Sequence, residues 1–292
     1  MIVYYFLLAV SIVLAVCKSS LYNSYAKNNE TTLRSTFRFN TVSYGAAAMV
    51  ALVGALVSRG TFSAATVLCA FFYAVIVFSL QTISIIAMSV GAMSTTAICV
   101  MYGMIIPSVA GPIFWKEPIG VLQIVGIIMM LVSLWFLKGK TPPENRKKTN
   151  KWILLALVAF ILSGMAGVME KIHQSTDGRE ERMSFVFVAC IFMFMLSVLG
   201  RFIAPRSREN SQAASIPWLA IPSGLVIGFY SIVNLTLSGK LASMIYYPIA
   251  NGGAMILTVL VSVVIFKERF DRLRIIGTVV GILGILFLSL PV

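Results

Sequence analysis

Ten stretches of about twenty mostly apolar residues follow one another along this 292-residue chain. A hydrocarbon core about 30 Å thick needs roughly 20 apolar residues per helix, so each stretch is long enough to cross a bilayer. Only 11% of the residues are charged, against about 25% in soluble proteins, and 59% are hydrophobic. The sequence therefore predicts an all-α integral membrane protein with ten transmembrane helices. The predicted spans are residues 2–21, 41–58, 62–86, 93–114, 118–137, 152–172, 183–203, 217–238, 243–266 and 273–291.

The sequence repeats itself at an offset of 151 residues, which aligns 92–137 with 243–288 without a gap. Because hydrophobicity alone would not match a Lys-Glu pair to a Lys-Glu pair, we predict two five-span repeats at 1–138 and 152–292, joined by a basic loop at 139–151. An odd number of spans per repeat inverts the second copy in the membrane. Identical pairs include Met104/Met255, Lys116/Lys267, Glu117/Glu268, Leu122/Leu273, Gly126/Gly277 and Phe136/Phe287.

Basic residues are unevenly divided between the two sets of loops. The loops after the first, third, fifth, seventh and ninth spans hold most of them, including six between Lys138 and Lys151. The positive-inside rule then places these loops in the cytoplasm and both termini outside.

The two aligned motifs resemble a known family pattern. Residues 114–118 read Phe-Trp-Lys-Glu-Pro, residues 266–269 read Phe-Lys-Glu-Arg, and each is followed by the Leu and Gly of the repeat. This resembles the EamA-like ten-span transporters of the drug/metabolite transporter (DMT) superfamily, over nearly the whole chain. The resemblance implies that spans 1, 3, 4, 6, 8 and 9 surround a central cavity, with spans 5 and 10 peripheral. It also implies cytoplasmic termini, which conflicts with the charge count, and both alternatives stay open.

Polar and aromatic residues recur at helical spacing along several predicted spans. For any one of them, a hydrogen bond between helices is the simpler explanation. Together they predict a cavity for a small amphipathic solute. Lys18, late in the first span, is interpreted either as a site for a carboxylate or phosphate or as a side chain that reaches the membrane surface. The predicted substrate-binding residues are Lys18, Tyr22, Tyr73, Gln81, Thr95, Tyr102, Tyr230, Asn234, Tyr247 and Asn251.

Acidic residues are expected only in loops or at span ends, which leaves no mid-membrane carboxylate. The nearest candidates for proton coupling are Glu170 and His173, which are three residues apart and share a helix face. The alternative is that these two residues and Lys171 mark where the sixth span leaves the lipid.

These features predict a secondary transporter, and not an enzyme, that exports a small metabolite such as an amino acid by alternating access. One His and two Asp in the chain are too few for a metal or catalytic site, and no cofactor is expected. The expected location is a bacterial cytoplasmic (inner) membrane, with the lipid bilayer and a small-molecule substrate as partners and no nucleic acid. Alternatives are a sugar, nucleotide-sugar or drug carrier of the same fold, or a receptor or assembly subunit without transport. A homodimer also stays open.

Overall fold

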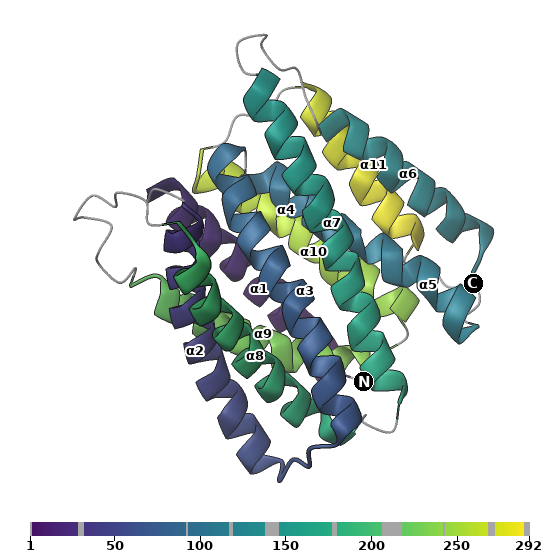
Figure 1. Ribbon diagram of the computed structural model, residues 1–292. Coiled ribbons are helices and arrows are strands. Elements are labelled where there is room, and N and C mark those ends of the chain that lie inside the picture. The colour runs from purple at the N-terminus through teal and green to yellow at the C-terminus, as the bar shows by residue number, and fades with distance from the viewer. Residues whose placement is uncertain are drawn as a thin grey trace.

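The computed structural model of the chain is a bundle of helices (Figure 1). It describes residues 2–28, 32–91, 93–116, 119–137, 146–176, 180–205, 218–241, 243–267 and 272–288. Within these ranges every regular element is a helix and none is a strand. The helices are α1 (Ile2–Asn28), α2 (Leu33–Val57), α3 (Ala64–Val90), α4 (Met93–Met101), η1 (Tyr102–Met104), α5 (Ile105–Trp115), α6 (Val121–Leu137), α7 (Arg146–Ser175), α8 (Arg182–Ile203), α9 (Ala220–Ser238), α10 (Ser243–Val264) and α11 (Arg272–Leu288).

Eight candidate membrane spans are present among the described residues, with α4, η1 and α5 counted as the single span Met93–Trp115. Two further apolar segments, Val121–Ser133 in α6 and Ile275–Leu288 in α11, are shorter. The prediction of an all-α membrane protein is confirmed. Each predicted span overlaps a helix, whereas the number of ten spans and their inverted arrangement stay predictions.

Several helices extend beyond the predicted apolar stretches. The helix α1 continues to Asn28, α2 begins at Leu33, and α7 begins at Arg146, inside the segment predicted as a basic loop. In the extensions of α1 and α2 several polar residues are buried, as Asn23 and Thr36 are, so their polarity does not mark a helix end. Helix boundaries read from hydropathy were therefore wrong where polar residues pack inside the bundle.

The fourth predicted span is interrupted by the 3₁₀ turn η1. Pro107 has no N–H and cannot donate to the carbonyl four residues earlier, at Gly103. Gly103 also lies directly on α7, where an added Cβ would come within 2.8 Å of the Phe160 carbonyl oxygen. The missing hydrogen-bond donor and the close backbone contact together account for the break.

The helices α6 and α11 form a close pair at one edge of the bundle (Figure 1). Their backbones touch, since a Cβ added to Gly126 would lie 2.5 Å from the Gly284 carbonyl oxygen. Small residues allow this approach, which is a common way for helices to associate in membranes. Large apolar side chains such as Trp135 and Phe202 stay exposed on the outside of the bundle, as expected of a surface that faces lipid.

Lys116 and Lys267, which the 151-residue offset pairs in sequence, share an unusual backbone conformation. Lys116 ends α5 with φ 53°, and Lys267 follows α10 with φ 51°. Few residues other than glycine adopt this left-handed conformation. The two halves of the chain therefore share local geometry as well as sequence at this position.

Candidate functional site

A cavity of about 160 Å³ lies inside the bundle. Its described lining comes from α1, α3, the interrupted helix Met93–Trp115, α7, α9 and α10. These helices correspond to predicted spans 1, 3, 4, 6, 8 and 9, the set that the family resemblance implies. Helices from both halves of the chain contribute, so the cavity lies between the two halves.

Lys18 of α1 and Glu170 of α7 are the charged side chains in the described lining of this cavity. The Lys18 Nζ lies 4.2 Å from the centre of the Tyr230 ring of α9, a cation–π contact. Glu170 is only 6% exposed. The site thus combines one cation and one anion, and their formal charges cancel.

The Glu170 carboxylate accepts hydrogen bonds from two neighbouring helices. The Tyr73 hydroxyl on α3 donates to Oε1 over 2.9 Å. The Asn234 amide nitrogen on α9 donates to Oε1 and Oε2 over 3.0 and 2.9 Å. Donors on both helices match a carboxylate that only accepts, which is the ionised form. Hydrogen bonds to an ionised group are stronger than neutral ones, so they fix Glu170 at the cavity wall.

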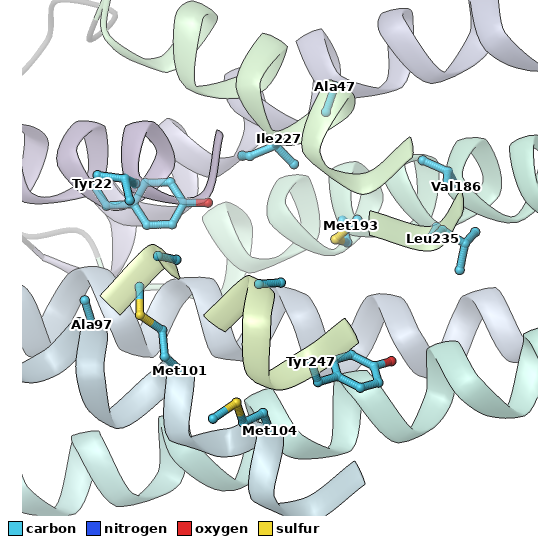
Figure 2. Close-up of a cluster of buried hydrophobic side chains, with 14 of the residues drawn as sticks. Tyr22, Ala47, Ala97, Met101, Met104, Val186, Met193, Ile227, Leu235 and Tyr247 are labelled. Atoms are coloured by element: carbon cyan, nitrogen blue, oxygen red, sulfur yellow. The ribbon is translucent and has the colours of Figure 1, made fainter. Parts of the chain in front are cut away.

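Part of the lining is apolar or aromatic. Figure 2 shows the side chains of Tyr22, Met101, Met104, Ile227 and Tyr247, all of which line the cavity. The Tyr247 hydroxyl is turned toward α7, where it donates to the Gly167 carbonyl oxygen over 3.2 Å. The cavity therefore combines the charged groups of Lys18 and Glu170 with methionine, isoleucine and aromatic side chains.

Eight of the ten residues predicted from the sequence to bind substrate lie together in this lining. Contact with a solute stays a prediction for each of them. The interpretation of Lys18 as a side chain that reaches the membrane surface does not fit its place over Tyr230. The eight residues are Lys18, Tyr22, Tyr73, Gln81, Tyr230, Asn234, Tyr247 and Asn251.

Thr95 and Tyr102, the other two, lie outside the described lining of the cavity. The Tyr102 hydroxyl lies 2.6 Å from the Ser133 hydroxyl of α6, and Thr95 is buried. The two residues share a helix face, as predicted, but the cavity faces the neighbouring stripe that contains Ala97, Met101 and Met104. A hydrogen bond between helices, the simpler explanation, applies to Tyr102, whereas the buried Thr95 hydroxyl has no hydrogen-bond partner among the described residues.

Glu170 lies near the end of α7, as predicted, but its side chain is buried inside the bundle. The helix α7 continues five residues beyond it to Ser175. His173 is also buried, with only 1% exposed, and the alternative that these residues mark where the sixth span leaves the lipid stays a prediction. The polar residues in this last part of α7 are buried against α3, α8 and α9, which is why the end of the apolar run is not the end of the helix.

His173 contacts a different set of residues from Glu170 and lies outside the described cavity lining. Its Nε2 lies 3.2 Å from the Thr66 hydroxyl, and its Nδ1 lies 3.1 Å from the Gln174 side-chain nitrogen. Its ring stacks on Phe185 with the ring centres 4.2 Å apart. A shared role with Glu170 in proton coupling stays a prediction.

Glu181 joins two loops at one end of the bundle. Its carboxylate accepts from the Thr61 hydroxyl over 3.0 Å and from the Ser63 hydroxyl and N–H over 2.6 and 3.0 Å. Hydrogen bonds from Ser63 and from Thr66 lower the pKa of Glu181 from 4.5 to about 2. The loop between α2 and α3 is thereby fastened to the start of α8, close to His173. The sequence contained no signal for this junction, because its partners lie more than 100 residues apart.

The chain is thus a helical membrane protein with an internal cavity that contains two charged side chains. Residues 150–290 match the EamA-like transporter family. Residues 150–290 are therefore an EamA-like domain of the DMT superfamily, which confirms the resemblance over this part of the chain. The matched family consists of membrane transporters and not of enzymes.

A solved structure described only as a crystal structure of a protein has the same fold, with a TM-score of 0.61. It is 14% identical in sequence, and the match covers 96% of this chain and 98% of that chain. No curated protein sequence matches this chain.

Proposed function

We propose that this chain is a secondary transporter that exports a small zwitterionic metabolite, an amino acid or a related amphipathic solute, by alternating access around the central cavity. The observation that carries this proposal is the presence of Lys18 and Glu170 in one cavity lined by both halves of the chain. The membrane transporter class comes from the family match, and the substrate, the direction and the mechanism are proposed.

The opposite charges of Lys18 and Glu170 favour a zwitterion. An ionised group in a low-dielectric interior is costly unless it is paired. A solute with both charges pairs its ammonium with Glu170 and its carboxylate with Lys18, and the cavity keeps zero net charge. A cation or an anion of the same size would leave one buried charge uncompensated. The face of the Tyr230 ring offers a further contact for an ammonium group.

The size of the cavity favours a small solute over a drug or a nucleotide sugar. Pockets for drug-sized ligands measure about 300–1,000 Å³, whereas this cavity measures about 160 Å³. The apolar wall formed by Met101, Met104 and Ile227 suits the side chain of an amphipathic amino acid.

Alternating access requires two halves that can move relative to each other, and repeats related by inversion supply them. The sequence repeat and the matching left-handed backbone at Lys116 and Lys267 support two repeats, 1–138 and 152–292, joined by segment 139–151. We propose that α6 and α11 are the fifth and tenth spans. Each has 17 residues, or about 25 Å of helix at 1.5 Å per residue, which a slightly thinned bilayer accommodates. The cytoplasmic membrane of a bacterium is the proposed location.

Release from proteoliposomes tests this function. Vesicles with the purified protein are loaded with amino acids, their amides, their N-acetyl derivatives and small sugars, and the contents are followed by mass spectrometry. We expect selective release of one or more free amino acids, with little loss of the singly charged analogues. Release of the sugars, or of only the cationic amides or only the anionic N-acetyl derivatives, would overturn the assignment of a zwitterionic substrate. No release from vesicles that hold folded protein in both orientations would favour a receptor or assembly subunit.

A further inference from the structure

Tyr246 of α10 is fully buried and lies outside the described lining of the cavity. Its hydroxyl donates a hydrogen bond to the Asn234 side-chain oxygen on α9. Its ring packs against Tyr247 with the ring centres 5.0 Å apart. Tyr246 therefore contacts two residues of the lining, Asn234 and Tyr247, without being part of the described lining itself.

The Asn234 amide has two different ends, and each contacts a different partner. Its oxygen accepts from Tyr246, and its nitrogen donates to both oxygens of Glu170. An amide can rotate by half a turn and exchange these ends, and hydrogen-bond partners decide which orientation is stable. A phenol that donates to the oxygen leaves the nitrogen for Glu170.

We propose that Tyr246 is a positioning residue that holds the Asn234 amide with its nitrogen toward Glu170, and so keeps the Glu170 carboxylate ionised at the cavity wall. The importance of that carboxylate for a solute rests on the proposed transport function. The positioning itself concerns only residues of this chain and can be measured without a solute.

Loss of the Tyr246 hydroxyl has a defined consequence in this arrangement. The Asn234 oxygen would be buried without a donor, which is unfavourable. Rotation of the amide would turn the oxygen toward Glu170, where it pairs best with a protonated carboxyl that donates its O–H. The amide orientation and the protonation of Glu170 are thus linked, and the phenol selects the orientation that suits the ionised form.

Other groups around Glu170 also influence its protonation and are unchanged in a Tyr246 variant. Lys18 on α1, Tyr73 on α3, Tyr230 on α9 and Tyr247 on α10 lie in the same cavity lining. Cys190 on α8 lines a second small hollow together with Glu170, and His173 lies one helical turn away on α7. A change observed in Tyr246→Phe but absent from a matched control is therefore assigned to the phenol.

Infrared difference spectroscopy on the reconstituted full chain at pH 7 tests the proposal. Subtracting the Glu170→Gln spectrum isolates the Glu170 signal, which we expect to be an ionised carboxylate band in the native sequence. In Tyr246→Phe more than half of that band should be replaced by the carbonyl band of a protonated carboxyl. Tyr102→Phe, which removes an equally buried phenol that bonds Ser133 instead, should retain the native band. An ionised band of native intensity in folded Tyr246→Phe, or a protonated Glu170 in the native chain, would overturn the proposal.

A second comparison separates positioning from a general packing effect. On an Asn234→Ala background the amide is missing, so Tyr246→Phe should produce no further change in the Glu170 band. An equal change on both backgrounds would contradict action through Asn234. Tyr246→Leu, which also lacks the phenol, provides the same test if the phenylalanine variant does not fold. These spectra do not depend on solute transport. The positioning role of Tyr246 can therefore be refuted independently of the proposed transport function.

Discussion

The ammonium group of Lys18 lies over the ring of Tyr230, 4.2 Å from its centre. The contact links α1 in the first half of the chain to α9 in the second, across the cavity that also contains Glu170. A cation over an aromatic ring is attracted by the negative face of the ring. A solute that engages either residue therefore also affects a contact between the two halves.

Substitutions of Tyr230 distinguish its ring from its hydroxyl. Tyr230→Leu removes the aromatic face, and a desolvated cation–π contact contributes about 1–2 kcal/mol. We expect the half-saturating solute concentration to rise roughly 5- to 30-fold. Tyr230→Phe keeps a ring and should stay within about threefold of the native value. The measurement is the concentration dependence of release from proteoliposomes. Equal defects in both variants would show that the Tyr230 hydroxyl, and not its ring, is the group that matters for the solute.

The Glu181 junction makes the stability of the protein depend on pH in the acid range. The pKa of Glu181 is lowered from 4.5 to about 2 by its hydrogen bonds from Ser63 and Thr66. A carboxyl with a depressed pKa in the folded state stabilises the fold above the unfolded value, and this contribution disappears as pH falls through the folded value. The junction is therefore expected to contribute fully to the stability of the fold above pH 4.5. This contribution should be lost as the pH falls from 4.5 to about 2.

Thermal unfolding in detergent, measured at several pH values, tests this expectation. The native chain should melt at a higher temperature than Glu181→Gln at pH 7, and the difference should shrink toward pH 2. Glu180→Gln changes an exposed neighbouring carboxyl and should melt like the native chain. A difference between the native chain and Glu181→Gln that does not vary with pH would contradict an ionised Glu181 in the junction.

The contact between α6 and α11 should tolerate no side chain at Gly126. A Cβ there would lie 2.5 Å from the Gly284 carbonyl oxygen and 2.8 Å from the Leu288 nitrogen, and both are backbone atoms. Gly126→Val should lower the free energy of unfolding by about 1–3 kcal/mol, the usual range for overpacking. Gly45→Ala provides the control, because its added Cβ would meet only the Phe194 ring at 3.6 Å. Equal melting temperatures for the two variants in detergent would show that α6 and α11 do not pack as described.

A cysteine label at position 180 reports the orientation of the chain in the membrane, because Glu180 is exposed beside the Glu181 junction. The charge count places the loop between α7 and α8 outside, so a cysteine introduced by Glu180→Cys should react with a membrane-impermeant maleimide in intact cells. The native chain, whose Cys17, Cys69, Cys99 and Cys190 all lie within helices, is the background control. Reaction only after permeabilisation would favour the cytoplasmic termini that the family resemblance implies.

The sequence predicted the helical architecture and placed eight of its ten candidate site residues in the cavity lining, because both depend on local patterns. Apolar runs mark the helices, and helical spacing places residues such as Tyr230 and Asn234 on one face. Spacing alone cannot decide which face turns inward, and this is why Thr95 and Tyr102 were assigned to the cavity although they pack elsewhere.

Glu170 shows a second limit of sequence-based reasoning. A carboxylate next to Lys171 at the end of an apolar run resembles a residue at the membrane surface. Its burial is compensated by donors from Tyr73 and Asn234, which lie 97 and 64 residues away along the chain. Such partners become visible only when the helices are brought together, and the same holds for Tyr246 and for the Glu181 junction.

The most direct test of the proposed solute site compares two variants, each of which lacks one carboxyl group. Both are measured in the proteoliposome release assay with a solute that the native protein releases. Glu170→Gln keeps the shape of the side chain and removes the proposed partner of the solute ammonium. A hydrogen bond to a charged group contributes about 1.5–3 kcal/mol, so we expect release at subsaturating solute to fall roughly 10- to 100-fold. Glu180→Gln, which changes an exposed carboxyl outside the described cavity lining, should release the solute at the native rate. Native rates for a folded Glu170→Gln protein would contradict a solute site at this carboxylate.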